Sequence, residues 1–280
     1  MRLVRYGPRG EEKPGLLDGD GVVRDLSDHV PDIGPEAISP TGWAYIAALD
    51  NAHLPLVQAP PRLGPPLSGI GKVIGIDLNY PDHVAELGAE LPSEPMTFLK
   101  ATSALTGPQD DIPCPEGADQ LDYEVELAVA IGTQARNVPV ERALAHVGGY
   151  LTFNDISERS WQYDRGGQWV KGKSHDGFAP LGPWLVSPEA VGDPQALGLS
   201  SVVNGVVRQA STTRAMLFDV AQIVSYLSQF MTLEPGDLIA TGTPAGIGMA
   251  QQPPGFLRPG DVLETEVGGL GRQRARIVAA

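Results

Sequence analysis

The stretch Gln120-Leu-Asp-Tyr-Glu-Val-Glu-Leu-Ala-Val-Ala-Ile-Gly132 decides how this chain is interpreted, because Glu124 and Glu126 interrupt an otherwise apolar, β-prone run. Side chains alternate between the two faces of a strand, so these two point the same way, about 6.6 Å apart along the backbone. Two neighbouring carboxylates repel each other and must be desolvated, and a cation offsets this cost. The pair alone leaves a second interpretation open, because antiparallel sheets often carry charged residues on a solvated face.

A third carboxylate follows. Leu151 to Phe153 is a short apolar stretch that ends in Asn154-Asp155, so Asp155 is expected at the carboxyl end of a strand. Three carboxylates from two strands would leave about three of roughly six positions around an octahedral ion for water and substrate. Carboxylate oxygens suit Mg²⁺, Mn²⁺ or Ca²⁺ better than zinc. The pattern therefore indicates a catalytic rather than a structural ion.

The residues around this core resemble the fumarylacetoacetate hydrolase family, over roughly residues 70 to 278. The resemblance depends on five blocks in the right order rather than on one decisive motif. They are Gly75-Ile-Asp-Leu-Asn-Tyr-Pro-Asp-His83-Val-Ala-Glu86-Leu-Gly88, Glu94-Pro-Met-Thr-Phe-Leu-Lys100, Glu124-Val-Glu126 with Asn154-Asp155, the segment from Arg159 and Gln162 to Lys173-Ser174, and Pro235-Gly-Asp-Leu-Ile-Ala-Thr-Gly-Thr243-Pro-Ala-Gly-Ile-Gly248.

The resemblance implies a role for each matching residue. Glu124, Glu126 and Asp155 would hold the divalent ion, usually Mg²⁺. Arg159, Gln162, Lys173 and Thr243 would contact substrate, and Arg159 and Gln162 at i, i+3 would face the same way on a helical turn.

His83 and Glu86 match a pair that activates water on a mobile segment of the family. Pro81 is well placed to start a helix, on which His83 and Glu86 at i, i+3 would be neighbours. The carboxylate could then orient the imidazole as a general base.

The implied reaction is hydrolysis of a carbon-carbon bond in a 2,4-dioxo acid, with pyruvate and a carboxylic acid as products. Water activated by His83 would attack the distal carbonyl, and Lys173 with the metal would stabilise the expelled enolate. The segment from Glu158 to Val186 is most similar to the branch that acts on 2,4-diketo-3-deoxy-L-fuconate or rhamnonate. The alternatives are an oxaloacetate-type decarboxylase or tautomerase using the same site, and a catalytically silent protein that binds 2-oxo acids.

Composition limits which partners and which cellular compartment are expected. The formal net charge of −14 disfavours nucleic acid and anionic membranes, which are bound by clusters of Lys and Arg. The first residues show no signal-peptide pattern, and the single Cys114 fits a reducing cytoplasm. Cys114 is interpreted as a packing residue rather than a nucleophile. The expected partner is a small 2-oxo acid, and the family resemblance implies a homodimer.

Many short β-prone runs with Gly and Pro between them predict a mainly β fold with some α-helix, in the α+β class. The proline-rich connector from Gln58 to Leu67 predicts a small N-terminal α/β domain over residues 1–68 and a catalytic domain over 69–280, which the resemblance implies is a β-roll. Asp18-Gly-Asp-Gly21 predicts a hairpin turn. Ser201 to Val207 is expected to be one strand, and Leu217 to Phe230 an amphipathic helix.

Overall fold

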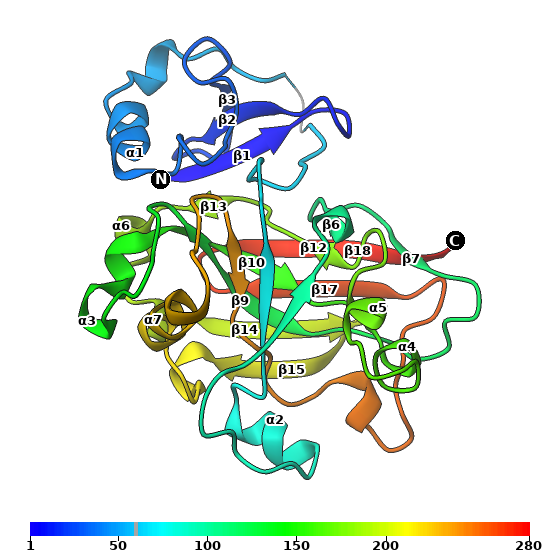
Figure 1. The fold of residues 1–280 in the computed structure, drawn as a ribbon. Helices are drawn as coiled ribbons and strands as arrows, with labels where there is room; N and C mark the ends of the chain where they lie inside the picture. The colour runs from blue at the N-terminus through cyan, green and yellow to red at the C-terminus, as the bar shows by residue number, and fades with distance from the viewer. Residues whose placement is uncertain (59–60) are drawn as a thin grey trace.

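The computed structural model describes residues 1–58 and 61–280, so residues 59–60 of the predicted connector lie outside the described part of the chain. A nine-stranded and a five-stranded sheet dominate the fold, with short helices around them (Figure 1). The prediction of a mainly β, α+β fold is confirmed. Among the described residues, every helix is too short or too polar to cross a membrane.

The strands of the larger sheet come from the N-terminal residues and from later segments of the chain as far as Ala240. Their spatial order is β3 (Val23–Asp25), β2 (Lys13–Leu17), β1 (Arg2–Tyr6), β13 (Leu185–Val186), β10 (Val147–Asn154), β9 (Val125–Ile131), β16 (Leu238–Ala240), β4 (Val73–Asp77) and β5 (Met96–Lys100). The smaller sheet has the order β15 (Val206–Thr212), β14 (Gly198–Val203), β17 (Val262–Val267), β18 (Gly271–Ala279) and β7 (Ile112–Cys114). Two short pairs join β11 (Ser157–Glu158) to β8 (Leu121–Asp122) and β12 (Ala179–Pro180) to β6 (Leu105–Thr106).

The α-helices lie between these strands in sequence. They are α1 (Pro40–Ala47), α2 (Pro81–Glu86), α3 (Val140–Ala143), α4 (Arg159–Tyr163), α5 (Val170–Lys173), α6 (Pro188–Val191) and α7 (Val220–Phe230). Helix α2 lies at the opposite end of the molecule from the N-terminal strands (Figure 1).

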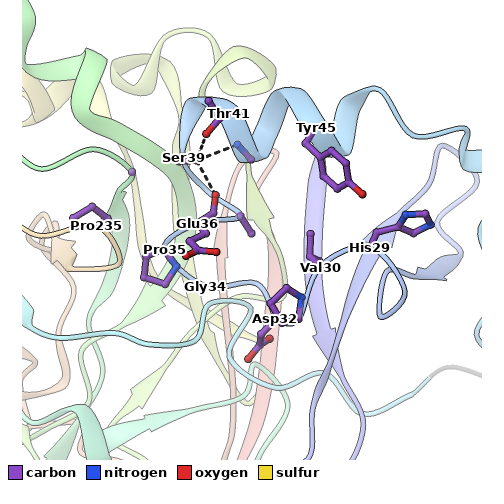
Figure 2. A pocket seen from close by; sticks show the side chains of 14 residues that line it. His29, Val30, Asp32, Gly34, Pro35, Glu36, Ser39, Thr41, Tyr45 and Pro235 are labelled. Atoms are coloured by element: carbon purple, nitrogen blue, oxygen red, sulfur yellow. Dashed lines mark hydrogen bonds between the residues drawn. The ribbon is translucent and has the colours of Figure 1, made fainter.

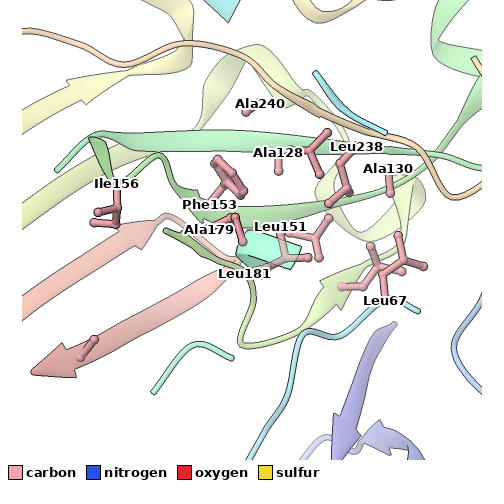
Figure 3. Packing of buried hydrophobic residues seen from close by; sticks show 14 of the residues in the cluster. Leu67, Ala128, Ala130, Leu151, Phe153, Ile156, Ala179, Leu181, Leu238 and Ala240 are labelled. Carbon is pink, nitrogen blue, oxygen red and sulfur yellow. The ribbon is translucent and has the colours of Figure 1, made fainter. Parts of the chain in front are cut away.

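Strand β9 is buried along its whole length, and its two faces differ. Val125, Val129 and the other odd-numbered residues pack in one core cluster with the apolar face of α7. Ala128 and Ala130 face a second cluster, where they lie near Leu151, Phe153, Leu238 and Leu67 (Figure 3). Glu124 and Glu126 continue the alternation of this second face, so the strand directs both carboxylates to the same side.

The N-terminal residues share a sheet and a core with the rest of the chain. Strand β1 pairs antiparallel with β13, so β1–β3 extend the nine-stranded sheet. Trp43 of α1 donates a buried hydrogen bond of 2.6 Å from Nε1 to the carbonyl oxygen of Gly148. The boundary near residue 68 stays a prediction, since these contacts describe packing rather than independent folding.

Two predicted elements have different limits. The strand expected from Ser201 to Val207 is wrong: Asn204 and Gly205 have φ values of 51° and 79° and form the turn of the β14–β15 hairpin. Such positive φ values at both central residues favour Asn-Gly. Helix α7 begins at Val220 rather than at Leu217, because Asp219 and Gln222 form a capping box at its N-terminus.

Candidate active site

Three buried carboxylates converge where β9 begins and β10 ends. Glu124, Glu126 and Asp155 are 5%, 1% and 0% exposed, and each offers one oxygen that lies within 4.8 Å of the others. Backbone pairing sets this geometry, because the Asp155 N–H donates to the Glu124 carbonyl oxygen over 2.9 Å. In addition, the Glu124 N–H donates to Asn154 Oδ1 over 3.1 Å. The structure thus brings together the three residues predicted to hold the ion.

Two buried lysines bind these carboxylates. Lys173, the last residue of α5, donates from Nζ to Glu124 Oε2 over 2.7 Å and to Asp155 Oδ2 over 2.6 Å. Lys100, the last residue of β5, donates to Asp155 Oδ1 over 2.5 Å and to the carbonyl oxygen of Ile156 over 3.1 Å. Asp155 is therefore held by one lysine on each oxygen.

Arg159 fixes the second side of Glu124. Its Nη2 donates to Glu124 Oε1 over 2.6 Å and its Nε donates to Asp122 Oδ2 over 3.0 Å. Its Nη1 donates to Gln162 Oε1 over 3.1 Å, as the i, i+3 spacing on α4 predicts. Within residues 1–58 and 61–280 the amide nitrogen of Gln162 donates no hydrogen bond, so it can donate to another acceptor.

The three carboxylates differ in electrostatic environment. Burial raises the pKa of Glu124, but the charges of Arg159 and Lys173 outweigh it and leave the pKa well below its usual range. Burial also raises the pKa of Glu126, and the neighbouring Asp155 and Glu124 raise it further. Glu126 accepts a hydrogen bond of 2.8 Å from the Gly242 N–H, and no lysine or arginine of residues 1–58 or 61–280 forms an ion pair with it.

The pKa values of the two lysines are also shifted in opposite directions. Burial lowers the pKa of Lys173, but Asp155 and Glu124 outweigh it and raise the pKa above its usual value. For Lys100, burial prevails over the attraction of Asp155 and lowers the pKa to about 8. Lys173 is thus held firmly as an ammonium between two carboxylates.

The residues fit a divalent cation. Four carboxylates (Asp122, Glu124, Glu126 and Asp155) face three cations (Lys100, Arg159 and Lys173), which leaves one negative charge uncompensated, and all seven side chains are buried. The excess lies at Glu126, which lacks a cationic partner. An all-oxygen donor set is typical of Mg²⁺, Mn²⁺ and Ca²⁺.

His83 and Glu86 form the expected pair on α2. Glu86 Oε2 lies 3.1 Å from His83 Nδ1, and its Oε1 accepts a hydrogen bond of 2.8 Å from the Gly246 N–H. His83 is 2% exposed. Helix α2 begins with Pro81 at its first turn, as predicted. In this structure α2 is therefore docked through Glu86 onto the loop that follows β16.

The hydroxyl of Thr243 is engaged within the protein. It donates to the Val125 carbonyl oxygen over 2.8 Å and accepts from Gln209 Nε2 over 2.7 Å. These bonds connect the loop after β16 to the start of β9. The side chain holds the carboxylate-bearing strand, and the predicted substrate contact of Thr243 stays a prediction.

Several residues near the carboxylates had no predicted role. Asp122 orients Arg159 and also accepts from the N–H groups of Gly248 and Met249 over 2.7 and 3.0 Å. Lys100 and Phe98 lie on β5, and Phe98 packs under Lys173 with its ring centroid 4.8 Å from Nζ. The alternation of side chains along a strand could have indicated these residues from the sequence. Asp122 lies two residues before Glu124, and Phe98 lies two residues before Lys100.

A large hollow lies away from the carboxylates. A hollow of about 880 Å³ lies beside α1, lined by residues such as His29, Asp32, Glu36 and Tyr45 with Pro235 at its edge (Figure 2). Most of its surroundings are small or apolar, and it contains none of the carboxylates described above. The carboxylate cluster therefore lies outside this hollow.

Comparisons with known proteins agree with the geometry. The family model of the fumarylacetoacetate (FAA) hydrolase C-terminal domain matches residues 72–278. A protein of Burkholderia multivorans with the provisional name hydrolase is 52% identical over 274 residues, which cover 98% of this chain and 97% of that protein.

Solved structures resemble the whole chain. Fumarylacetoacetate hydrolase from Exiguobacterium antarcticum has a TM-score of 0.89 and 36% identity, with 100% of both chains covered. Maleylpyruvate hydrolase from Sphingobium sp. SYK-6, solved with manganese(II) and pyruvate, has a TM-score of 0.82 and 29% identity over 100% of both chains. A 2-hydroxyhepta-2,4-diene-1,7-dioate isomerase from Mycobacterium marinum has a TM-score of 0.76 and 32% identity, covering 100% of this chain and 98% of that one. This chain belongs to the fumarylacetoacetate hydrolase family.

Proposed function

We propose that this enzyme is a divalent-metal-dependent hydrolase that cleaves a carbon-carbon bond of a 2,4-dioxo acid and releases pyruvate. The observation that carries the proposal is the arrangement of Lys173 between Glu124 and Asp155, beside Glu126, which has no cationic partner. It combines a site for a hard cation with a fixed ammonium group. The manganese and pyruvate in the Sphingobium enzyme support the same choice of ligands.

Each residue has a distinct part in the proposed reaction. A bound Mg²⁺ or Mn²⁺ held by Glu124, Glu126 and Asp155 would supply Lewis-acid polarisation of the 2-oxo acid. Lys173 donates a hydrogen bond to the oxygen on which enolate charge develops, a contribution on the order of 3 kcal/mol for a well-placed donor. Arg159 and the free amide nitrogen of Gln162 orient the substrate carboxylate. We also propose that Thr243 contacts substrate.

His83 is the proposed general base. With Nδ1 facing Glu86, its Nε2 can accept a proton from water, whose oxygen then bonds to the distal carbonyl carbon, C4. The C3–C4 bond breaks, its electron pair passes to the pyruvate enolate, and the C4 fragment leaves as a carboxylic acid. A proton then adds to C3 to give pyruvate, so one water is consumed for each bond cleaved.

The alternative is an isomerase or decarboxylase acting through the same groups without a hydrolytic water. The likeness to an isomerase of Mycobacterium marinum favours keeping it. Loss of carbon dioxide from oxaloacetate needs the ion and Lys173 but no hydrolytic water. Tautomerisation of a 2-oxo acid also needs a group that accepts the proton from carbon and returns it to oxygen. A protein that binds 2-oxo acids without catalysis is the third candidate, although His83, Glu86 and Lys173 are all present.

The test is a panel of substrates with defined metals. Acetylpyruvate, oxaloacetate and a 2,4-dioxo acid with a hydroxylated chain are incubated with the enzyme and Mg²⁺, Mn²⁺, Ca²⁺ or EDTA, and pyruvate is measured. Metal-dependent release from acetylpyruvate supports the hydrolase. Release from oxaloacetate alone would favour the decarboxylase, and no turnover with any metal would favour a binding protein.

We also propose that the enzyme acts in the cytoplasm as a homodimer. The single cysteine supports a reducing compartment, and the family resemblance supports the dimer. Sedimentation of the purified protein tests the oligomeric state.

A further inference from the structure

One face of strand β5 forms a wall along which the side chains change in character with distance from the carboxylates. Met96, Phe98 and Lys100 alternate on one face, with about 6.6 Å between successive members. Lys100 binds Asp155 at the inner end, and the Phe98 ring lies 4.8 Å from Lys173 Nζ. Met96 is 42% exposed at the outer end. The wall thus changes from charged to aromatic to apolar as it leaves the proposed reaction centre.

The position of Phe98 depends on a glycine in the neighbouring strand. Phe98 is paired with Gly75 across β4 and β5, and a Cβ atom at Gly75 would come within 2.2 Å of the Phe98 ring. A side chain at residue 75 would therefore displace the ring from Lys173. The glycine keeps the aromatic face beside the ammonium group.

A cleft of about 660 Å³ lies along this wall. Its opposite side is formed by Gly167 to Val170, which lead into α5. Trp169 lies 5.8 Å from Phe98 and 5.8 Å from Tyr163 between ring centroids, so three aromatic side chains form a row. Val170 is 43% exposed on the same segment. Both sides of the cleft consequently present aromatic and aliphatic side chains, with Thr97 and Gln168 as polar neighbours.

The charged groups around the cleft also limit which substrate tails it can bind. Among its lining residues in the described part of the chain, Asp77 alone has an ionisable side chain, an acid whose pKa is raised by burial and by the charge of Glu124. The nearby cations have other partners. Lys173 donates to Glu124 and Asp155, Lys171 donates to the Arg165 carbonyl oxygen over 2.7 Å, and Arg165 lies over the Trp161 ring. A substrate tail ending in a carboxylate would find repulsion here instead of a partner. The polar side chains among the described lining residues are Asp77, Thr97 and Gln168, so a polyhydroxylated tail would lose water with few side-chain partners to replace it.

We propose that this cleft binds the distal acyl group of the substrate and selects an uncharged, apolar group of aromatic size. The inference rests on the proposed function, since it places the 2-oxo acid head at the carboxylate triad. It differs from the deoxy-sugar-acid tail that the sequence resemblance implies, and from the second carboxylate in the substrate name of the isomerase relative. Trp169 and Met96 are the specificity-determining residues.

The test uses three ligands with the same head. 2-Oxobutanoate, 2-oxoglutarate and 2-oxo-4-phenylbutanoate share the 2-oxo acid and differ only in a hydrogen, a carboxylate or a phenyl group at C4. Their affinities are measured by calorimetry with the full chain and Mn²⁺. Burial of about half a phenyl ring corresponds to roughly ten-fold tighter binding. We expect the phenyl ligand to bind at least that much tighter than 2-oxobutanoate, and 2-oxoglutarate to bind no tighter.

Two variants examine the assignment to this cleft. Trp169→Ala should bring the ratio of the affinity for 2-oxo-4-phenylbutanoate to that for 2-oxobutanoate closer to one. Met96→Arg places a cation at an exposed position and should increase the affinity for 2-oxoglutarate relative to 2-oxobutanoate several-fold. The matched control is Val207→Arg, which adds the same charge at a position 62% exposed on β15 and should change neither ratio.

The outcomes separate this inference from the proposed function, which acetylpyruvate cleavage with Mg²⁺ tests independently. Equal affinities, or tightest binding of 2-oxoglutarate, would overturn the apolar cleft even if acetylpyruvate is cleaved. Binding of the phenyl ligand with no cleavage of any 2,4-dioxo acid would support the cleft and overturn the hydrolase. Absence of binding by all three ligands would overturn the inference.

Discussion

Lys100 Nζ lies 2.5 Å from Asp155 Oδ1, and both side chains are completely buried. The resemblance to known hydrolases directed attention to Lys173, which holds the other oxygen of the same carboxylate. The two lysines therefore share the compensation of one buried aspartate. Removing one cation of a buried pair leaves an uncompensated charge, which is strongly destabilising.

We expect Lys100→Met to lower the free energy of unfolding of the metal-free protein by about 3–5 kcal/mol. Added Mg²⁺ should restore more stability to the variant than it adds to the wild type, because the ion can compensate Asp155. Denaturant unfolding with and without Mg²⁺ measures both effects. Lys171→Met, at an exposed position outside the carboxylate cluster, is the control and should stay within about 0.5 kcal/mol of wild type. An unchanged metal-free stability would contradict the role of Lys100.

Glu126→Gln should separate metal binding from folding. Among the described residues, Glu126 is the member of the carboxylate triad that no lysine or arginine pairs with, and the amide oxygen of a glutamine can still accept from the Gly242 N–H. We expect unchanged or higher stability without metal, because a buried anion is removed. Affinity for Mn²⁺ and release of pyruvate from acetylpyruvate should fall at least roughly 100-fold, since even partners outside the ligand set cost 10- to 100-fold.

Calorimetric titration with Mn²⁺ and an activity assay check the two effects. The control is Glu141→Gln at an exposed position of α3. An active Glu126→Gln variant with wild-type metal affinity would remove Glu126 from the ligand set.

The sequence predicted the carboxylate cluster well because it depends on local alternation. Glu124 and Glu126 occupy one face of a strand, and Asp155 follows the strand that pairs with it, so a short-range pattern is enough to bring them together. His83 and Glu86 were predictable for the same reason, as two residues one helical turn apart.

Contacts between distant segments were not predictable in this way. No local pattern shows that Lys100 reaches Asp155 or that the Gly246 N–H meets Glu86, since each bond joins residues far apart in the chain. The hairpin at Asn204-Gly205 is a different case. Its turn signal is local, but the β-prone residues on both sides concealed it.

His83→Ala should distinguish the two chemistries of the site. If His83 activates water, the variant loses acetylpyruvate hydrolysis by roughly 10²- to 10⁴-fold. Decarboxylation of oxaloacetate should decrease far less, because it requires no hydrolytic water. Both rates are measured on the same preparation with Mn²⁺, and His53→Ala at an exposed position is the control. Equal losses of the two activities would count against the water-activating role.

An ion-pair network that joins Glu12, Arg62 and Asp110 should make the stability of the protein sensitive to acid. Arg62 donates to Asp110 over 2.6 Å and to Glu12 over 2.8 Å. Burial raises the pKa of both carboxyl groups, but the hydrogen bonds of Arg62 together with backbone hydrogen bonds and other neighbours outweigh it and leave both pKa values lowered. A lowered folded-state pKa stabilises the protein above the unfolded pKa, about 4, and this stabilisation is lost as the pH falls through the folded value.

We expect Arg62→Met to cost about 1–3 kcal/mol at pH 7 and progressively less below about pH 4. Thermal unfolding of both proteins between pH 7 and pH 3 measures the difference. Arg276→Met is the control, because its pair with Asp111 is exposed and should contribute less than about 1 kcal/mol. If the difference in stability between wild type and Arg62→Met is the same at pH 7 and at pH 3, Arg62 acts through packing alone.

Helix α2 is expected to act as a lid whose docking depends on ligand. It carries the proposed base, and Glu86 attaches it to the loop after β16 through one hydrogen bond to the Gly246 N–H. The chain between Tyr80 and Ser93 contains this short helix and several charged residues. Gly88 has a φ of 63°, which turns the chain sharply after the helix. Closure of such a segment would exclude solvent and strengthen the electrostatics around the developing charge.

Hydrogen exchange of residues 83–89 measures this docking. We expect weak protection of the Val84, Leu87 and Ala89 amides with Mg²⁺ alone and clearly stronger protection when oxalate is added. Glu86→Ala should abolish the increase, because it removes both the link to Gly246 and the partner of His83. The amides of α7, buried against the large sheet, provide an internal reference that oxalate should not change. Strong protection that is the same with and without oxalate would make α2 a fixed element, and His83 would then be a structural histidine rather than a base brought to the substrate by closure.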